Sequence, residues 1–306
     1  MTLSRTELTR IAVLFVLCAI LWWLVPHFGT FYNLRNVLRL GSLLALLSFG
    51  MTFSLLVGGI DLSIGAVIAL SGCVTAGLIT QGHFAEGVII GVLIGASCGL
   101  LNGVLIGYLG LPPFVATYGM MRIARGLAFS YTGGYCIYGF DPGFRWLGTG
   151  FIAGIPAPIF IALGMAVLLC FIAYRTVLGK EIYAVGANRV TAKYTGINVK
   201  KTLLIVYVMS GVLSAFAGFI YIARLNAAEP IIGELFVLDA VAATVIGGTS
   251  FAGGEGGPIG TVIGALIIAV LQNGLNLMGV PPQWQLVLIG SVIILAVTVD
   301  MVAKKV

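Results

Sequence analysis

The sequence predicts an all-α polytopic membrane protein with about ten transmembrane helices, some of them broken or re-entrant. Of its 306 residues, 60% are hydrophobic and 8% are charged, whereas soluble proteins carry about 25% charged residues. The mean hydropathy is +1.13. Ten crossings of about 20 apolar residues would use about 200 residues. The remainder is too short for a soluble catalytic domain, so we expect one transmembrane domain over residues 1–306.

The glycine content and the charge agree with this fold class. The 43 glycines suit helices packed in lipid, because small residues let helix backbones approach closely. The net charge of +6 indicates no nucleic-acid partner, since in a membrane protein the placement of charges matters more than their sum. The five cysteines do not form a disulfide pattern.

Apolar runs between polar, glycine or proline breaks predict the helices of the first half. The N-terminal run follows Arg5 and Arg10 in the manner of a secretory signal. It ends at Pro26 and His27 without a small-residue cleavage site, so we expect a retained first helix. The predicted helices lie at residues 11–26, 41–58, 62–80, 87–109 and 114–132.

The second half repeats this number of apolar runs. The eighth run of the whole chain is the shortest. The predicted helices of the second half lie at residues 157–174, 203–223, 236–249, 259–279 and 284–300.

Basic residues predict the orientation. An even number of crossings puts both termini on one side, together with the connection over residues 175–201. That side carries ten basic residues against four on the other, so we expect it to be cytoplasmic. The ten are Arg5, Arg10, Arg175, Lys180, Arg189, Lys193, Lys200, Lys201, Lys304 and Lys305, and the four are Arg35, Arg39, Arg145 and Arg224.

Two connections are long enough to have a role of their own. The external one, over residues 133–156, is rich in aromatic and turn residues. It is typical either of a compact loop with a contact surface or of an aromatic belt that anchors helix ends. The cytoplasmic one, over residues 175–201, contains Asn188, which can cap a short helix beginning near Arg189, and Gly196, which can end it. The alternative is an ordinary positively charged loop.

Two glycine-rich segments interrupt apolar runs. They contain Gly58, Gly59 and Asp61 in the first half and Gly247 and Gly248 in the second. Such breaks persist in a membrane only at its face, inside protein or along a watery cavity, and paired broken helices are typical of a translocation pathway. Asp61 either contacts solute or, as we favour, accepts hydrogen bonds from the first amides of the next helix. A phosphate-binding loop is excluded, because no Lys-Ser or Lys-Thr follows the glycines.

Uncharged amides lie inside the predicted spans. Amides both donate and accept hydrogen bonds, which suits hydroxyl-rich solutes, and an aromatic ring suits an apolar sugar face. The alternative for each amide is a hydrogen bond between helices. The candidate pathway residues are Asn102, Phe114, Gln272, Asn273 and Asn276.

Charged side chains inside the spans indicate neither catalysis nor proton transport. Arg122 and Arg125 share a helix face, and structural pairing is the favoured interpretation for them. The two histidines are isolated, so no metal site or nucleophile is indicated. The few acids, Asp61, Asp239 and Asp300, lie near span ends and do not form a proton relay.

Several sequence blocks, in order along almost the whole chain, resemble one family. The blocks are GMT at 50–52, GGIDLSIG at 58–65, PFVAT at 113–117, RG at 125–126, AVGAN at 184–188, GINV at 196–199, LDAVAA at 238–243, GGTS at 247–250 and NGLNL at 273–277. They resemble the permease subunits of bacterial ATP-binding-cassette (ABC) sugar importers of the ribose and galactose type, with ribose permeases closest. Ala187 stands where the family has a second glycine. Residues 140–144 look more like galactose-type relatives, which leaves the sugar open.

The resemblance implies a transport subunit and not an enzyme, in the bacterial inner (plasma) membrane. It implies a second permease subunit, identical or different, and a periplasmic or lipid-anchored sugar-binding protein that delivers a monosaccharide. A tandem ATPase would bind ATP and Mg²⁺, and no cofactor belongs to this chain, which lacks a Walker motif. By the same resemblance, the ATPase contacts Gly186, Ala187, Asn188, Ala192 and Gly196. A secondary transporter or facilitator is the competing class.

Overall fold

The computed structural model describes residues 5–303 and confirms an all-α architecture with only two-residue strands. The helices are α1 (Arg5–Leu24), α2 (Phe31–Leu56), α3 (Ile64–Thr80), α4 (Phe84–Gly107), α5 (Pro113–Thr132), α6 (Pro142–Thr149), α7 (Ala157–Arg175), α8 (Val177–Ala187), α9 (Arg189–Tyr194), α10 (Val199–Leu225), α11 (Phe236–Ile246), α12 (Pro258–Leu277) and α13 (Pro282–Ala303). The strands are β1 (Ile137–Tyr138), β2 (Phe151–Ile152), β3 (Ile155–Pro156) and β4 (Ala227–Ala228).

Each of the ten predicted spans coincides with a helix. Within the described residues, six of them are long and apolar enough to cross a membrane, namely those of α1, α2, α4, α7, α10 and α12. The apolar helices α3, with 17 residues, and α11, with 11, are shorter than a crossing needs. α3 follows the first glycine-rich break and α11 precedes the second. The prediction of broken helices is therefore confirmed.

The start of α2 differs from the predicted 41–58. The helix begins ten residues earlier, because the Thr30 hydroxyl accepts a hydrogen bond from the Asn33 amide at 3.3 Å. Two arginines that were assigned to a connection lie inside this helix. The Arg35 guanidinium is 4.0 Å from the centre of the Phe31 ring, and that of Arg39 is 5.3 Å from the Phe151 ring. Stacking on aromatic rings keeps these charges in the first turns of the helix.

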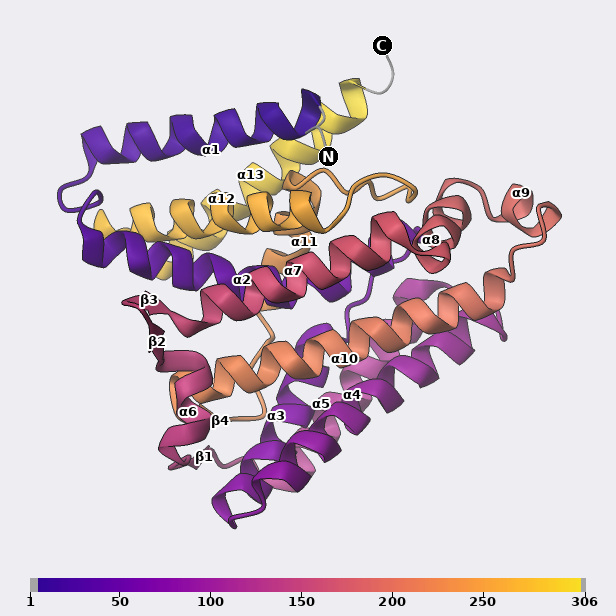
Figure 1. Ribbon diagram of the computed structural model, residues 1–306, viewed down its shortest axis with the longest axis horizontal. Coiled ribbons are helices and arrows are strands. Elements are labelled where there is room, and N and C mark those ends of the chain that lie inside the picture. The colour runs from indigo at the N-terminus through magenta and orange to yellow at the C-terminus, as the bar shows by residue number, and fades with distance from the viewer. Residues whose placement is uncertain (1–4, 304–306) are drawn as a thin grey trace.

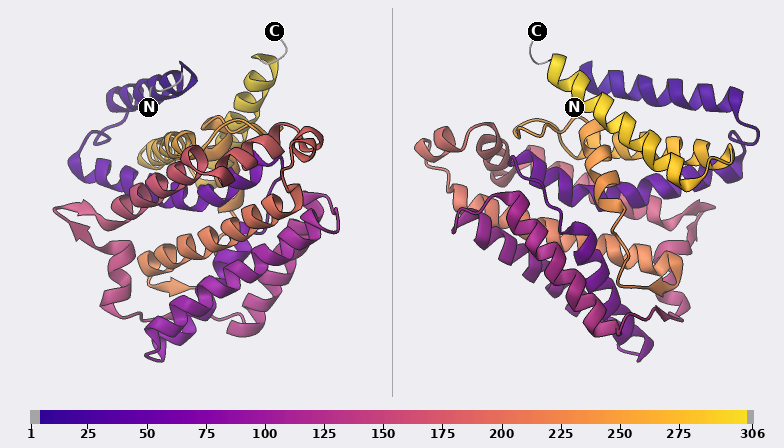
Figure 2. Two further views of the ribbon diagram at one scale, coloured as in Figure 1. Left: turned by 45° about the vertical axis from the view of Figure 1, so that its right-hand side comes forward. Right: turned by 180° about the vertical axis from the view of Figure 1, so that it is seen from behind.

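α2 and α10 form the centre of the bundle. α2 packs against α7, α10, α11 and α12, and α10 packs against α2, α3 and α4. Figures 1 and 2 show α1 and α12 on one side of this centre and α3, α4 and α5 on the other. Phe49 and Phe53 of α2 are fully buried, so the core follows α2 along its length.

The connection over residues 133–156 is folded, as the compact-loop interpretation predicts. β1 pairs with β4 and β2 pairs with β3, both antiparallel. Asp141 caps α6 by accepting a hydrogen bond from the Gly143 amide at 2.7 Å. Phe144 is fully buried, with its ring centre 5.5 Å from that of Phe140. Figure 1 shows this loop at the end of the molecule opposite to α8 and α9.

A row of glycines joins α4 to its neighbours at every fourth residue from 87 to 107. A Cβ atom at Gly95 would meet the carbonyl oxygen of Gly211, and one at Gly99 would meet that of Tyr207. The backbones of α4 and α10 are thus in direct contact, and no side chain fits between them. This seam fixes the spacing of two membrane-spanning helices.

The seam predicts that Gly99→Ala destabilises the protein by about 1–3 kcal/mol, because the added methyl group must push α10 away. The unfolding temperature in detergent measures this effect. Gly164→Ala is the matched control, since Gly164 lies in α7 with open space where a Cβ would be. Equal unfolding temperatures for the two variants would contradict close backbone packing at the seam.

Candidate functional site

The first helix break, over residues 57–63, is organised around the buried carboxyl group of Asp61. One oxygen of this group accepts hydrogen bonds from the Ser63 amide at 3.0 Å and the Ser63 hydroxyl at 2.6 Å. The other accepts the Ser210 hydroxyl of α10 at 2.7 Å. Asn102 of α4 donates to the Ser63 hydroxyl at 2.9 Å. Asp61 is 1% exposed, and its carboxyl group ties the break to α10 directly and to α4 through Ser63. The predicted capping of the next helix by Asp61 is wrong, because Ser63 is the N-cap residue of α3 and no side chain caps its first amides.

The backbone of the break has protein partners, as a break inside a membrane requires. The Thr117 hydroxyl of α5 accepts from the Leu62 amide at 3.2 Å and donates to the Ile60 carbonyl at 3.1 Å. Gly58 adopts a φ of 72°, which glycine accepts without strain. A Cβ at Gly59 would meet the Tyr207 hydroxyl and the Pro113 ring. Both glycines are therefore needed for the path of the chain.

The second break, over residues 247–257, lies against the first. The Gly254 amide donates to the Leu56 carbonyl at the end of α2, at 2.9 Å. Gly247 contacts the backbone of Gly260 in α12, where a Cβ would meet the Gly260 carbonyl. Gly248 has a φ of 86°. The two breaks thus share one contact region, although almost 200 residues separate them.

The connection over residues 175–201 contains two helices. Thr176 caps α8 by accepting from the Gly179 amide at 3.1 Å. Asn188 caps α9 by accepting from the Val190 and Thr191 amides at 2.9 and 3.0 Å. Gly196, with a φ of 88°, follows the end of α9. The capped helix predicted from Asn188 and Gly196 is confirmed.

Helix α8 was missed by the sequence analysis, although its signal is present. Thr176 is a favoured N-cap residue. The apolar residues Leu178, Ile182 and Val185 follow at helical spacing, and the last two are fully buried. A capping residue followed by this periodicity predicts a short amphipathic helix.

α8 and α9 contact both breaks. A Cβ at Gly186 would meet the Leu56 carbonyl oxygen. The Tyr183 hydroxyl donates to the Gly256 carbonyl at 2.7 Å, and the Arg189 guanidinium donates to the Val57 carbonyl at 3.0 Å. Burial raises the pKa of Tyr183, so its hydroxyl keeps the donating proton. We call this contact region of α8, α9 and the two breaks the junction.

Ala192, which the resemblance places at the ATPase contact, does not lie on the outward face of α9. Ala192 is 3% exposed and belongs to the buried core, because α9 turns this side chain toward its own chain. The outward face of α9 carries Val190, 64% exposed, and Tyr194, 88% exposed. Ala187 and Asn188 are exposed beside them.

The predicted pathway residues do not form a single cluster. Asn102 is fully buried, on the α4 side of the bundle. The amides at 272, 273 and 276 are on α12, across α2 from α4 (Figures 1 and 2). Phe114 begins α5, is 58% exposed and stacks on Tyr118, with ring centres 6.1 Å apart.

The three α12 amides have partners on other segments, as the alternative interpretation expects. Gln272 donates to the Asp239 carboxyl of α11 at 3.1 Å. Asn273 pairs with Asn33 of α2 at 2.8 and 2.9 Å. Asn276 accepts from Gln285 of α13 at 2.9 Å and is exposed. These bonds connect α12 to three neighbouring helices.

The two arginines of α5 have different surroundings. Arg125 donates to the Pro230 carbonyl and, at 2.8 Å, to the Ile232 carbonyl, so backbone oxygens hold it in place. Arg122 is exposed. Of the basic residues behind the predicted orientation, Lys304 and Lys305 lie outside the described residues.

The chain is similar to a known class of transport proteins. Residues 33–297 match the family described as branched-chain amino acid transport system / permease component. The chain belongs to this family of permease components. It is therefore a transport subunit and not an enzyme, and with its apolar helices it is a multi-pass inner-membrane protein.

Individual relatives cover almost the whole chain. The ribose import permease protein RbsC of Bacillus subtilis is 44% identical over 94% of this chain and 90% of its own length. The D-allose transport system permease protein AlsC of Escherichia coli is 42% identical over 96% of this chain and 91% of its own. The galactose/methyl galactoside import permease protein MglC of Escherichia coli is 37% identical over 94% and 92%. No solved structure matches the chain.

The Asp61 cluster predicts that Ser210→Ala lowers stability by about 1–3 kcal/mol, because a buried carboxyl oxygen loses its donor. Thermal unfolding in detergent measures the loss. The control is Ser214→Ala, one turn further along α10, whose equally buried hydroxyl bonds only to the Ser210 carbonyl of the same helix. A Ser210→Ala variant as stable as the control would contradict the role given to Asp61.

Proposed function

We propose that this protein is the membrane-spanning permease subunit of an ABC importer for a monosaccharide, ribose or a related pentose or hexose. The observation that carries the proposal is 37–44% identity to ribose, D-allose and galactose import permeases over nearly the whole chain. The two helix breaks, which lie against each other, support it, since broken helices are typical of transport pathways.

The pathway is proposed to use uncharged groups. Of the predicted pathway residues, Phe114 and Asn276 are exposed and are available to a solute or a neighbouring subunit. The Phe114 and Tyr118 rings form a stacked pair beside the first break, to which α5 is joined through Thr117. Such rings suit the apolar face of a sugar. Asn102, Gln272 and Asn273 would then support the pathway through the helices they connect.

The proposed complex contains a second permease subunit, identical or related, a sugar-binding protein outside and a tandem ATPase inside. ATP and Mg²⁺ would be bound by the ATPase chain. We propose that both termini and residues 175–201 face the cytoplasm and that residues 133–156 face outside, on the basis of the basic-residue asymmetry. The two loops lie at opposite ends of the bundle (Figure 1), which is compatible with this orientation.

Transport by reconstituted protein tests this function. Proteoliposomes that contain the permease, its ATPase and its sugar-binding protein should take up labelled ribose, allose or galactose only when ATP is present. Omitting the ATPase should abolish uptake. Rapid uptake by the permease alone would instead identify a facilitator and overturn the proposal.

The outward face of α9, with Val190 and Tyr194, is the proposed contact for the ATPase. An exposed aromatic residue at the centre of an interface commonly contributes more than about 1 kcal/mol. Tyr194→Ala should therefore weaken ATPase binding by about fivefold or more, measured by co-purification or surface plasmon resonance. Tyr135→Ala is the matched control, since Tyr135 is 80% exposed in the loop at the opposite end. Wild-type ATPase affinity in Tyr194→Ala would remove this face from the contact.

A further inference from the structure

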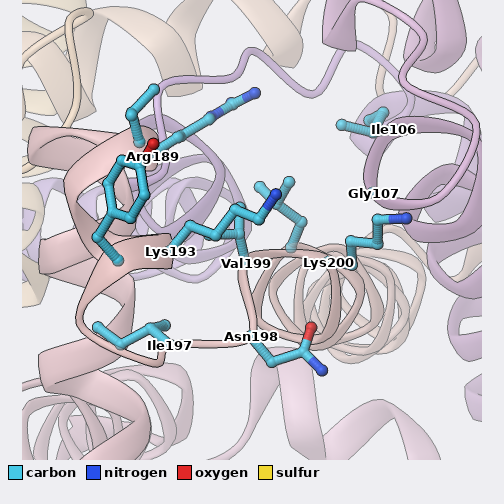
Figure 3. Close-up of a pocket in the computed structure, with 11 residues that line it drawn as sticks. Ile106, Gly107, Arg189, Lys193, Ile197, Asn198, Val199 and Lys200 are labelled. Carbon is cyan, nitrogen blue, oxygen red and sulfur yellow. The ribbon is translucent and has the colours of Figure 1, made fainter.

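Arg122 differs from the basic residues near the proposed ATPase contact in its position along a helix. Arg189, Lys193 and Lys200 line a cavity of about 760 Å³ where α4 ends, α9 runs past and α10 begins (Figure 3). They lie at helix ends, beside the face of α9 that is already proposed for the ATPase. Arg122 is instead the tenth of the 20 residues of α5, so it lies about 15 Å from either end of its helix.

The neighbouring helix α4 fixes the depth of Arg122. A groove between the two helices brings Ile123 of α5 beside Leu93 and Leu101 of α4. These leucines lie on either side of the centre of α4, which is long and apolar enough to cross the membrane. Arg122 is therefore at the middle of the bundle, and it is exposed there.

A surface turned to lipid does not suit this side chain. A charged residue at the bilayer centre is costly, and such residues face the interior of a bundle, a partner or a water-filled cavity. Arg122 forms no ion pair and no side-chain hydrogen bond with the part of the chain that the structure describes. Its charge is thus left for water or for a bound molecule.

α5 also differs in composition from a helix that faces lipid. On α7, every exposed residue between 157 and 174 is apolar, and Val167 is 70% exposed. α5 has enough residues for a crossing, yet within the described residues it is not among the helices that are apolar enough for one. The exposed face of α5 therefore lies along water and not along lipid.

This face of α5 also carries aromatic rings and open space. Phe114, Tyr118 and Arg122 follow one another at intervals of four residues, so they form one row along the helix. The two rings are stacked, with their centres 6.1 Å apart. At Gly126, the next position of the row, and at Gly119, a Cβ atom would have no neighbour within 4 Å. The row combines an apolar surface with a strong hydrogen-bond donor and room for a solute.

A second exposed charge lies close to this row. Arg125 of α5 donates to the carbonyls of Pro230 and Ile232, which brings Glu234, two residues further along, close to α5. Glu234 is exposed and, in the part of the chain that the structure describes, forms no ion pair. Figure 2 (right) shows α5 and the connection from β4 to α11 on the same face of the bundle.

We propose that Arg122 contacts the transported sugar in a water-filled pathway along this face of α5. The proposal rests on the proposed function and adds charged side chains to the uncharged groups given there. The guanidinium donates hydrogen bonds to neighbouring sugar hydroxyls, and the rings of Phe114 and Tyr118 contact the apolar face of the sugar. Glu234 accepts a hydrogen bond from a further hydroxyl. A neutral solute with several hydroxyls uses both charges without carrying one itself.

Aqueous labelling in proteoliposomes tests the exposure of this face. With an impermeant methanethiosulfonate reagent on both sides, Arg122→Cys and Glu234→Cys should react at least about tenfold faster than Val167→Cys, since a thiol in lipid does not ionise. Wild type gives the background of the five native cysteines. Excess ribose, allose or galactose should slow the reaction at position 122.

Sugar uptake by the complete transporter tests the role of the guanidinium. Arg122→Leu should lower uptake by about tenfold, because a hydrogen bond from a charged donor is lost. Arg122→Lys should lower it less, since an ammonium group still donates. Both variants should bind the ATPase as wild type does, and Val167→Cys should transport normally.

Three results would overturn the proposal. Labelling of Arg122→Cys as slow as that of Val167→Cys would place this face against lipid or inside a closed contact. Rapid labelling that none of the sugars slows would remove the sugar contact. Restored uptake in the double variant Arg122→Glu/Glu234→Arg, when each single variant fails, would identify an ion pair between the two positions instead.

The labelling result is independent of the proposed function, because it requires neither ATP nor the ATPase. Uptake by the permease alone, with labelling at positions 122 and 234 as expected, would overturn the ATP-driven function and would still support the pathway along α5.

Discussion

The absence of a side chain at Gly186 is the constraint on which the junction depends. The Cα atom of Gly186 lies so close to the end of α2 that a methyl group there would overlap the Leu56 carbonyl. The same carbonyl accepts the Gly254 amide of the second break. At this point α8, α2 and the segment before α12 therefore meet through backbone atoms. A contact between two backbones is rigid and transmits a displacement, since no flexible side chain lies between them to absorb it.

The junction continues into the bundle through the first break. Two residues beyond Gly59, Asp61 is bonded to Ser63 and Ser210, and Asn102 joins α4 to the same cluster. α4 and α10 are held together by the glycine seam. A displacement of α8 would thus act on the ends of α2 and α12 first and on the α3–α4–α10 group through Asp61. Packed backbones and buried hydrogen bonds give such coupling a continuous physical route.

The same junction gives α9 a mechanical role. Asn188 joins α8 to α9 by capping the second helix, and Arg189 bonds to Val57 of the first break. A partner that moves the outward face of α9 pushes on structures that are already in contact with both breaks. For a permease driven by a separate ATPase, this arrangement relates the proposed docking face to the proposed pathway. Coupling requires that the partner bind the two conformations with different affinity.

The sequence was sufficient for the helices of the ten apolar runs, the breaks and the cap of α9, because these follow from local hydropathy, glycine and capping chemistry. The short helices α6 and α8 were not predicted. The first turns of α2 were not predicted, because two charged residues, Arg35 and Arg39, indicated a loop between helices. Their place in a helix is explained by contact with aromatic rings, including the distant ring of Phe151. The burial of Ala192 likewise depends on tertiary packing that local sequence does not contain.

The predicted pathway amides also depend on tertiary packing that the local sequence does not contain. A sequence pattern identifies an amide inside a span but not its partner, and the pairing of Asn273 with Asn33 joins residues 240 positions apart. Hydrogen bonding between helices and contact with solute use the same side-chain chemistry. Only the folded chain shows which partner each amide has. The predicted pathway residues therefore do not form one cluster but lie on α4, α5 and α12.

The central claim is that the junction transmits motion between the ATPase and the helix breaks, and Gly186→Ala tests it most directly. Gly164→Ala serves as the control, and Tyr183→Phe, which removes the hydroxyl that donates to Gly256, serves as a milder variant if Gly186→Ala does not fold. Uptake per ATP hydrolysed should be measured in proteoliposomes. Both junction variants should bind the ATPase normally, because the outward face of α9 is unchanged, and should transport less sugar per ATP than the control. Wild-type coupling in folded Gly186→Ala and in Tyr183→Phe would contradict the claim.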